Sequence, residues 1–198
     1  MERDSFIIGI TGGTGCGKTT LLNCIAEKGG LILDCDEIYH RLLQTDAHLL
    51  RSIENRFPGV VENGVLQRKK LGNIVFSDEN ALCDLNKITH TAVKAEVLRL
   101  LESGPKLAAI DAIGLFEGGL AELCDTTVAV TAPTEDRVRR LMARDNISEE
   151  YARKRITAQR SGAEFSALCD HTLENDGDIG AFRTKCLAFL AELDIIEV

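Results

Sequence analysis

The chain reads GGTGCGKT from Gly12 to Thr19, which matches the pattern G-x-x-x-x-G-K-[ST]. An apolar run over residues 6–10 stands directly before this motif, and a helix-like segment follows it at residues 21–26. A strand, a glycine-rich turn and a helix in this order bring successive backbone N–H groups and the positive end of the helix around one centre. The start of the chain is therefore predicted to be a phosphate-binding loop rather than a glycine-rich turn with a surface lysine.

Each position of this loop has an expected task. Lys18 supplies a mobile cation for the β- and γ-phosphate oxygens of a nucleotide, and the Thr19 hydroxyl is an oxygen ligand of the kind that Mg²⁺ prefers. The residues of this segment that we predict to bind the nucleotide are Gly12, Gly13, Thr14, Gly15, Cys16, Gly17, Lys18, Thr19 and Thr20.

Composition narrows the class of protein. With 198 residues, 44% of them hydrophobic, the chain is long enough for one substantial core, so one compact domain is expected. A net charge of −8 argues against a nucleic-acid or membrane surface, because phosphate backbones and anionic headgroups require clustered lysine and arginine. No apolar stretch approaches the ~20 residues of a membrane span, and the first residues resemble no secretory signal. A cytoplasmic protein is expected.

The seven cysteines are an odd number without a C-x-x-C pair, and the four histidines form no ligand-like group with them. Reduced thiols are therefore expected. Cys16 lies inside the predicted loop and Cys35 lies between two aspartates, so oxidation of either could block the site. That is a hypothesis drawn from position alone.

Short runs of Ile, Val, Leu and Ala alternate with amphipathic segments. Strands are predicted at residues 6–11, 31–34, 107–111, 127–131 and 171–174, and the first helix at residues 18–27. This alternation predicts a three-layer α/β fold with a parallel sheet of about five strands. Residues 37–103 have a helical pattern with breaks at 57–59 and 62–64 and no convincing strand, which indicates a helical substrate-side insertion. Thr134 and Ser148 have the residue types of helix N-caps.

Three aspartates follow predicted strands. Asp34 and Asp36 come after the second strand, and Asp36 could accept the proton of an acceptor hydroxyl. The alternatives are that Asp36 caps the helix that follows and that Asp34 makes a loop hydrogen bond. Asp111 closes the run at 107–110, where a carboxylate can hold a water of a metal shell or simply end a strand. His90 has no role that its surroundings in the sequence indicate.

Seven arginines fall within residues 137–160, a stretch that reads as two helices joined near residues 145–147. Because a guanidinium forks onto phosphate oxygens and stays charged, such a hinged pair suits a cationic lid over a triphosphate. The alternative is a solvated helix surface with i,i+4 ion pairs, which fits most of these arginines. We single out Arg140 and Arg144 as phosphate ligands.

The motifs together resemble one family, dephospho-coenzyme A kinase, from Ile8 to about Gly177. The resemblance is carried by segments in a shared order, namely residues 11–20, 33–38, 62–66 with 74–77, 85–90, 115–117, 132–133, 140–145, 158–159 and 174–177.

Membership of this family implies transfer of the γ-phosphoryl group of ATP to the ribose 3′-hydroxyl of dephospho-CoA, the last step of CoA synthesis. It implies one P-loop kinase domain over residues 1–198, with a core of about 5–36, 104–136 and 165–198, an acceptor-side insertion of about 37–103 and a lid of about 137–164. It favours Asp36 as the general base and Arg140 and Arg144 as lid residues. It also implies His90 on the acceptor side, and Asn175 and Gly177 near the adenine.

Two other functions remain open at this point. One is a kinase of the same architecture that acts on a nucleoside, a nucleotide or a shikimate-like alcohol, because spacing rules cannot decode the acceptor from the helical insertion. The other is a nucleotide-dependent switch that hydrolyses ATP or GTP slowly. Against the switch, the chain lacks the Asn-Lys-x-Asp guanine signature and carries an acidic pair where an acceptor base belongs.

Overall fold

The computed structural model describes residues 5–195. These residues form two compact units. Unit 1 comprises residues 5–33, Gly104–Leu115 and residues 120–195, and unit 2 comprises Asp34–Ser103 and Phe116–Gly119. Within residues 5–195, no helix combines the length and the apolar composition that a membrane span requires.

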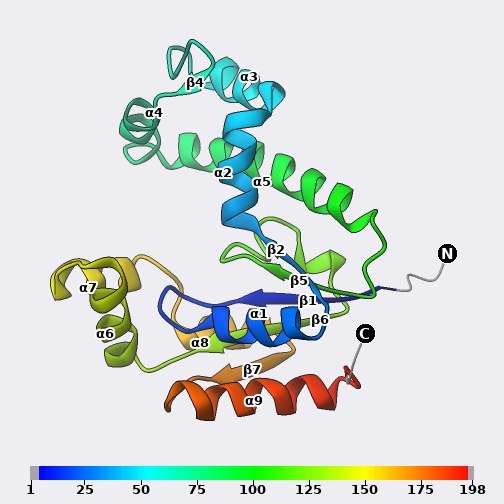
Figure 1. The fold of residues 1–198 in the computed structure, drawn as a ribbon. Coiled ribbons are helices and arrows are strands. Elements are labelled where there is room, and N and C mark those ends of the chain that lie inside the picture. Colours follow the sequence, from blue (N-terminus) through cyan, green and yellow to red (C-terminus); the bar gives the residue numbers. More distant parts are fainter. Residues whose placement is uncertain (1–4, 196–198) are drawn as a thin grey trace. The chain divides into compact units, whose positions relative to one another are not determined.

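A five-stranded sheet is the centre of unit 1 (Figure 1). Its strand order is β2-β5-β1-β6-β7. Strand β1 pairs in parallel with β5 and with β6, and β6 pairs in parallel with β7. The strands are β1 (Phe6–Thr11), β2 (Leu31–Asp34), β5 (Leu107–Asp111), β6 (Thr126–Thr131) and β7 (His171–Glu174). The inner strands β1, β5 and β6 are almost wholly buried, as expected where helices cover both faces. The predicted parallel α/β fold is confirmed.

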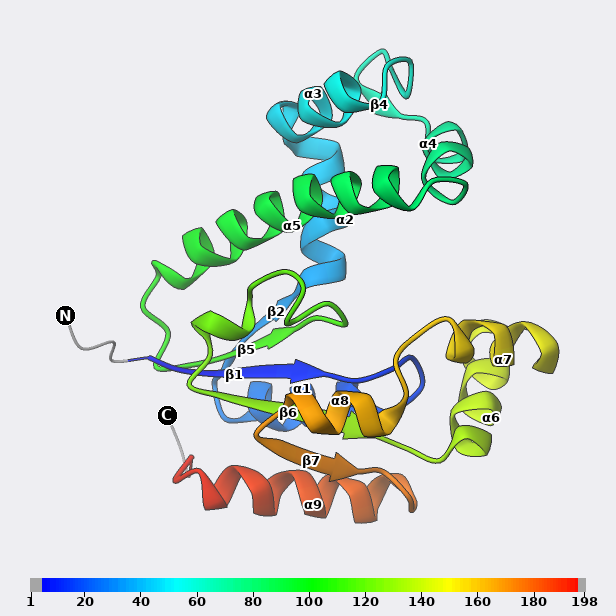
Figure 2. The same cartoon turned by 180° about the vertical axis from the view of Figure 1, so that it is seen from behind.

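Helices cover the two faces of this sheet. Helix α1 (Lys18–Glu27) lies on one face, and the short α8 (Gly162–Leu168) lies on the other, as Figures 1 and 2 show from opposite sides. Helix α9 (Ile179–Glu192) packs beside α1, and a short 3₁₀ helix spans Ala121–Leu123. Side chains from β1, α1, β6 and α9 form one apolar core, to which Ile8, Leu21, Val128 and Phe182 each contribute.

Helices α6 (Thr134–Asp145) and α7 (Glu149–Thr157) form the arginine-rich pair. They enclose a small core of their own made by Val138, Leu141, Ala152 and Ile156. Ser148 caps α7, because its Oγ accepts a hydrogen bond from the Tyr151 N–H at 3.2 Å.

The predicted cap at Thr134 is wrong. Thr134 is already inside α6, and Pro133 occupies the cap position without a side-chain hydrogen bond. Proline has a fixed φ that suits the entry to a helix, so the helix begins one residue earlier than the threonine suggested.

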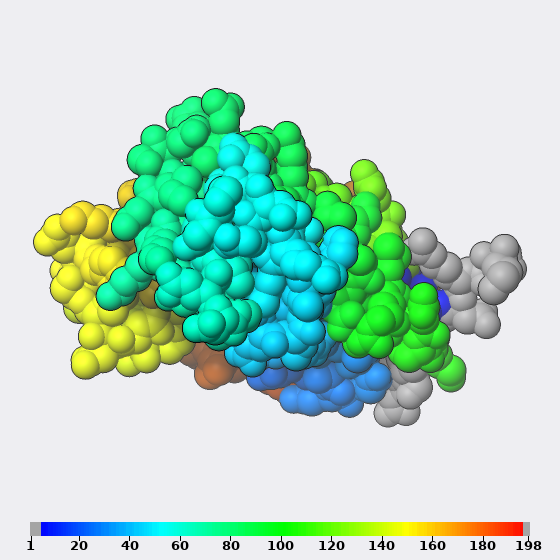
Figure 3. All heavy atoms as spheres, turned by 90° about the horizontal axis from the view of Figure 1, so that it is seen from above, coloured from blue at the N-terminus to red at the C-terminus, as the bar shows by residue number. Residues whose placement is uncertain are grey.

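Unit 2 is built on the long helix α5 (Glu79–Leu101), which packs against α2 (Cys35–Thr45), α3 (Ala47–Arg56) and α4 (Arg68–Val75). The cyan residues in Figure 3 belong to this unit. Three of its helices are capped by aspartates, whose carboxylates accept backbone N–H groups: Asp34 for α2, Asp46 for α3 and Asp78 for α5.

The expectation that residues 37–103 contain no strand is wrong in one place. Strands β3 (Val61–Glu62) and β4 (Val65–Leu66) form an antiparallel hairpin. Its turn residues Asn63 and Gly64 have φ values of 50° and 77°. Positive φ at both central residues is the geometry of a two-residue hairpin, for which Asn-Gly is the preferred sequence.

Candidate functional site

The predicted phosphate-binding loop connects β1 to α1 and lies at the carboxyl end of β1. Gly17 is the N-cap residue of α1 with a φ of 99°, and a Cβ at this position would lie 2.3 Å from Nδ2 of Asn175, so only glycine fits. No side chain from residues 5–195 caps α1, so its first backbone N–H groups remain available to an anion. This uncapped helix start is the arrangement that binds phosphate groups.

The Lys18 side chain contacts the backbone of its own loop. Its Nζ donates to the carbonyl oxygen of Gly12 at 3.0 Å and lies 3.8 Å from Oδ1 of Asp111. Asp111 ends β5 and is paired in register with Ile10 of the adjacent β1, which is why a carboxylate from residue 111 meets a lysine from residue 18. Thr19 is exposed one residue further along α1. Predicted residues from two chain segments are thus brought together here.

Asn175 supports the loop from the end of β7. Its side chain is buried, with Nδ2 donating to the carbonyl oxygen of Cys16 at 2.9 Å and Oδ1 accepting from Nη2 of Arg140 at 3.1 Å. Its backbone N–H donates to the carbonyl oxygen of Thr131 at 2.8 Å. Gly177 is exposed in the connection from β7 to α9. The observed contacts of the Asn175 side chain are therefore with the loop and with Arg140.

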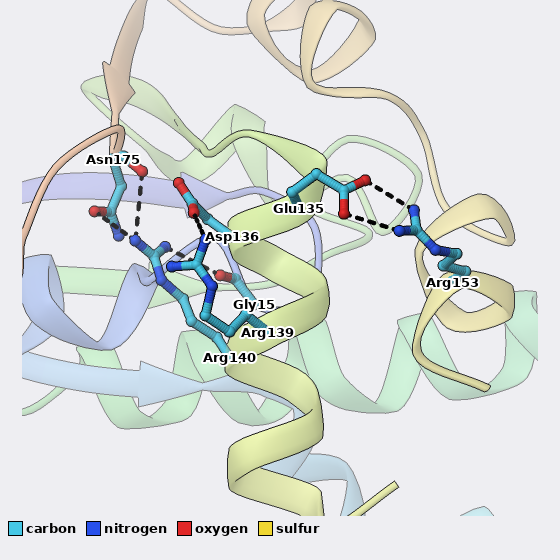
Figure 4. A network of polar contacts seen from close by, with 7 residues as sticks. All are labelled: Gly15, Glu135, Asp136, Arg139, Arg140, Arg153 and Asn175. Carbon is cyan, nitrogen blue, oxygen red and sulfur yellow. Dashed lines mark hydrogen bonds and ion pairs between the residues drawn. The ribbon is translucent and has the colours of Figure 1, made fainter. Parts of the chain in front are cut away.

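The two predicted arginine ligands, Arg140 and Arg144, differ in their surroundings. Arg140 points to the loop, where its Nη1 lies 3.3 Å from the carbonyl oxygen of Gly15 and 3.4 Å from that of Cys16 (Figure 4). Arg144 is exposed and donates through Nε to the carboxylate of Asp145 at 2.6 Å. Hydrogen bonds from Arg144 and Arg155 lower the pKa of Asp145 to about 2.

Several other arginines of this stretch form surface ion pairs, as the alternative interpretation expected. Arg139 pairs with Asp136, and Arg153 joins Glu135 of α6 to α7 (Figure 4). Arg137 is the exception, because it is buried and its Nε donates to the carbonyl oxygen of Thr14 at 2.9 Å. The sequence interpretation counted Arg137 among the lid arginines and did not single it out, since i,i+4 spacing says nothing about a contact 123 residues away.

In unit 2, Asp34 is the N-cap of α2. Its Oδ1 accepts the backbone N–H of Asp36 at 2.9 Å and that of Glu37 at 3.0 Å. The alternative in which Asp36 caps the helix is wrong, because α2 begins at Cys35 and the cap position falls on Asp34. The Asp36 carboxylate is exposed in the first turn and makes no hydrogen bond or ion pair with the described residues.

His90 lies on α5 at a hollow of about 470 Å³ within unit 2. Lys87 and Lys94 on the same helix line this hollow, together with residues 117–119. The spacing of the three basic residues along α5 places them on one face of the helix. His90 thus shares this hollow with two lysines and with Glu117, which the sequence alone did not indicate.

The oxidation hypothesis for the loop cysteine loses support. Cys16 is buried, and burial raises the pKa of its thiol although Arg137 and Lys18 act in the opposite direction. A thiol held in its protonated form reacts slowly with oxidants, because the thiolate is the reactive species. Cys35 is also buried, and none of the seven cysteines forms a disulfide.

Comparison with known proteins gives a consistent result. A family model described as dephospho-CoA kinase matches residues 6–181. A protein named dephospho-CoA kinase from Geobacillus kaustophilus is 36% identical over 196 residues, covering 96% of this chain and 98% of its own length.

Solved structures agree with the sequence matches. The crystal structure of TT1252 from Thermus thermophilus superposes with a TM-score of 0.80 at 33% identity, covering 96% of this chain and 98% of that chain. The structure named dephospho-CoA kinase from Campylobacter jejuni gives a TM-score of 0.65 at 26% identity, covering 94% and 96% of the two chains.

Proposed function

The chain belongs to the dephospho-CoA kinase family, and we propose that it transfers the γ-phosphoryl group of ATP to the ribose 3′-hydroxyl of dephospho-CoA, giving CoA and ADP. The observation that carries the proposal is the glycine-rich loop before the uncapped start of α1, in a chain that the family model matches over residues 6–181. A kinase of this family uses ATP as the phosphoryl donor.

We assign the nucleotide's phosphates to the loop. Backbone N–H groups at the start of α1 point at the phosphate oxygens, and Lys18 exchanges its contact with the Gly12 carbonyl for a contact with the β- and γ-phosphate oxygens. Arg140 is already held beside the carbonyl groups of the loop, so its charge adds to the cationic field at that point. Arg144 is the second proposed phosphate ligand and lies one helical turn further along α6.

The residues at the loop suit Mg²⁺, because the available donors are a threonine hydroxyl and an aspartate carboxylate, both hard oxygen ligands. Thr19 would hold the ion directly and Asp111 through a water molecule. When bound, Mg²⁺ neutralises charge that develops on the phosphate oxygens during transfer. The Lys18 ammonium lies 3.8 Å from Oδ1 of Asp111, so the lysine and this carboxylate lie side by side at the loop.

We propose Asp36 as the base that orients the acceptor hydroxyl and takes its proton. Its carboxylate is exposed and is not used to cap α2, which leaves its oxygens available for this task. Asp34 fixes the first turn of α2 by capping it and so fixes the backbone that carries Asp36. Asp34 and His90 are assigned to acceptor binding, and Asn175 and Gly177 to the adenine side of the nucleotide.

We also propose one kinase domain in which residues 37–103 form the acceptor side and residues 137–164 the lid. The cytoplasm is the proposed compartment, since seven cysteines without a disulfide fit a reducing environment.

Acceptor-dependent release of ADP from ATP tests the function. We expect ADP release to require dephospho-CoA and to be absent with CoA, because CoA matches dephospho-CoA except that its 3′-hydroxyl already carries phosphate. Shikimate, nucleosides and nucleoside monophosphates are tested as alternative acceptors, and ATP or GTP alone tests the switch. Turnover with any of these and not with dephospho-CoA would refute the proposal.

A further inference from the structure

Arg137 is a buried cation that the proposed reaction has not used. Arg137 is only 4% exposed, although the other charged residues of helix α6 are exposed or only partly buried. Its Nε donates to the carbonyl oxygen of Thr14 at 2.9 Å, and its Nη2 has no hydrogen-bond partner among the described residues. A guanidinium is rarely buried without full pairing because desolvation of its charge is costly. A specific task at the loop explains its retention there better than a surface role does.

The peptide groups of Thr14 are held from both sides. The Thr14 carbonyl oxygen accepts from Arg137, and the Thr14 N–H donates to Oε1 of Gln159 at 2.8 Å. Gln159 follows α7, so both partners come from the far end of the chain. The Thr14 N–H belongs to the peptide group before this residue and the Thr14 C=O to the one after it, so neither peptide group can rotate without breaking a hydrogen bond.

The guanidinium also lies directly against Gly13. A Cβ on Gly13 would be 2.3 Å from Nη2 of Arg137 and 3.2 Å from Oε1 of Gln159. The next glycine, Gly15, approaches the backbone of Arg137 in the same way, since a Cβ there would lie 3.1 Å from its carbonyl oxygen. At Gly13 and Gly15 the backbone of the loop is therefore packed against Arg137 of α6, with no room for a side chain between them.

From these contacts we infer that Arg137 is a positioning residue for phosphoryl transfer, which with Gln159 clamps the Thr14 peptide and holds the loop in its phosphate-binding shape. Arg137 contacts the backbone of the loop at Thr14 and acts through it. The backbone N–H groups that follow Thr14 converge on one centre only if the loop keeps its present backbone conformation. Fixing the peptide groups on both sides of Thr14 restricts the φ and ψ angles on which that conformation depends. The inference rests on the proposed function, since it assigns the loop to the nucleotide.

The first test compares Arg137→Gln with Arg137→Lys and two controls. A hydrogen bond from a charged group corresponds to a change of about tenfold to a hundredfold in an equilibrium constant, so we expect Arg137→Gln to weaken ATP binding by at least about tenfold. The KM for dephospho-CoA stays within about twofold of the wild-type value. Arg137→Lys recovers part of the loss, because its ammonium can donate to the Thr14 carbonyl but lacks the planar fork.

The controls separate positioning from general stability. Arg139→Gln removes an exposed arginine from the same helix, and Val138→Ala opens a cavity in the small core of α6 and α7. We expect both to keep the wild-type affinity for ATP, and Val138→Ala to lower the unfolding temperature. An unchanged ATP affinity in Arg137→Gln would overturn the inference, and so would an equal loss of affinity in Val138→Ala.

A double-mutant cycle with Gly13→Ala makes the test independent of the acceptor. The backbone of Gly13 is compatible with alanine, so the new methyl group acts by displacing the guanidinium. Adding Arg137→Gln to Gly13→Ala should then cause little further loss of ATP affinity measured by calorimetry. Losses that multiply would contradict the inference. Because calorimetry uses ATP alone, the result stands even if dephospho-CoA proves not to be the acceptor.

Discussion

Asn175, which follows β7, supports the loop through hydrogen bonds of its side chain. Replacing Asn175 by alanine tests how much these bonds contribute to stability and to ATP binding. The change removes the hydrogen bond from Nδ2 to the Cys16 carbonyl at 2.9 Å and the one that Oδ1 accepts from Arg140 at 3.1 Å. Asn175 is 5% exposed, so water cannot simply replace the amide. Each buried group left without its partner costs about 1 to 3 kcal/mol. Because the Cys16 carbonyl oxygen keeps a contact with Nη1 of Arg140 at 3.4 Å, we expect a total loss of about 2 to 4 kcal/mol in the free energy of unfolding.

For a chain of this length, 1 kcal/mol corresponds to about 2 to 4 °C in unfolding temperature, so Asn175→Ala should unfold about 4 to 16 °C below the wild type. The measurement is thermal unfolding followed by circular dichroism, with ATP affinity measured by calorimetry at a temperature where both proteins are folded. ATP affinity should fall as well, because the Cys16 peptide and Arg140 both lose a partner at the loop.

Asp176→Ala is the matched control. Asp176 is the next residue, but its carboxylate is exposed and pairs with Lys185, and such surface pairs contribute little to stability. This variant should unfold within about 4 °C of the wild type and bind ATP normally. The reasoning would be refuted if Asn175→Ala behaved like Asp176→Ala in both measurements.

Three further predictions concern charges and thiols. Lys18→Ala should weaken ATP binding by about tenfold to a hundredfold and lower turnover, and calorimetry with steady-state kinetics checks both. The native pKa of Asp145 is lowered from 3.8 to about 2, so its ion pairs stabilise the fold above pH 3.8 and are lost as pH falls toward 2. As pH is lowered across that interval, the unfolding temperature of Asp145→Asn should fall less than that of the wild type. A thiol reagent should label the exposed Cys83 first with activity retained, whereas buried Cys16 reacts only on unfolding.

Much of the fold could be predicted because its signals are local. Strands at residues 6–11, 31–34, 107–111 and 171–174 and the helix at 18–27 were predicted with the bounds that the structure gives. Most of these strands are short apolar runs, and Gly29-Gly30 separates the helix from the strand that follows it. The strand predicted at 127–131 begins one residue earlier, at Thr126. The loop motif predicted the P-loop fold, because the motif stands between a strand-like run and a helix-like segment, which is the context that a P-loop requires.

The hairpin at Val61–Leu66 was missed although Asn63-Gly64 is a strong turn signal. Its strands have two residues each, which is too short for an alternating pattern to be visible. The burial of Arg137 was missed for a different reason. Its partner Thr14 lies 123 residues away, and the fold rather than the helix pattern brings the two together. The role of Asp36 stays a prediction, although its alternative as a helix cap is excluded.

The turnover of Asp36→Asn tests the central claim most directly, namely that a carboxylate outside the phosphate loop readies the acceptor hydroxyl. Asparagine keeps the size of the side chain and removes its ability to take a proton. We expect turnover to fall by about 10² or more with ATP affinity within about twofold of the wild type. Glu37→Gln, the exposed neighbour in the same helical turn, serves as control and should keep wild-type turnover. Near-normal turnover in Asp36→Asn would contradict the account.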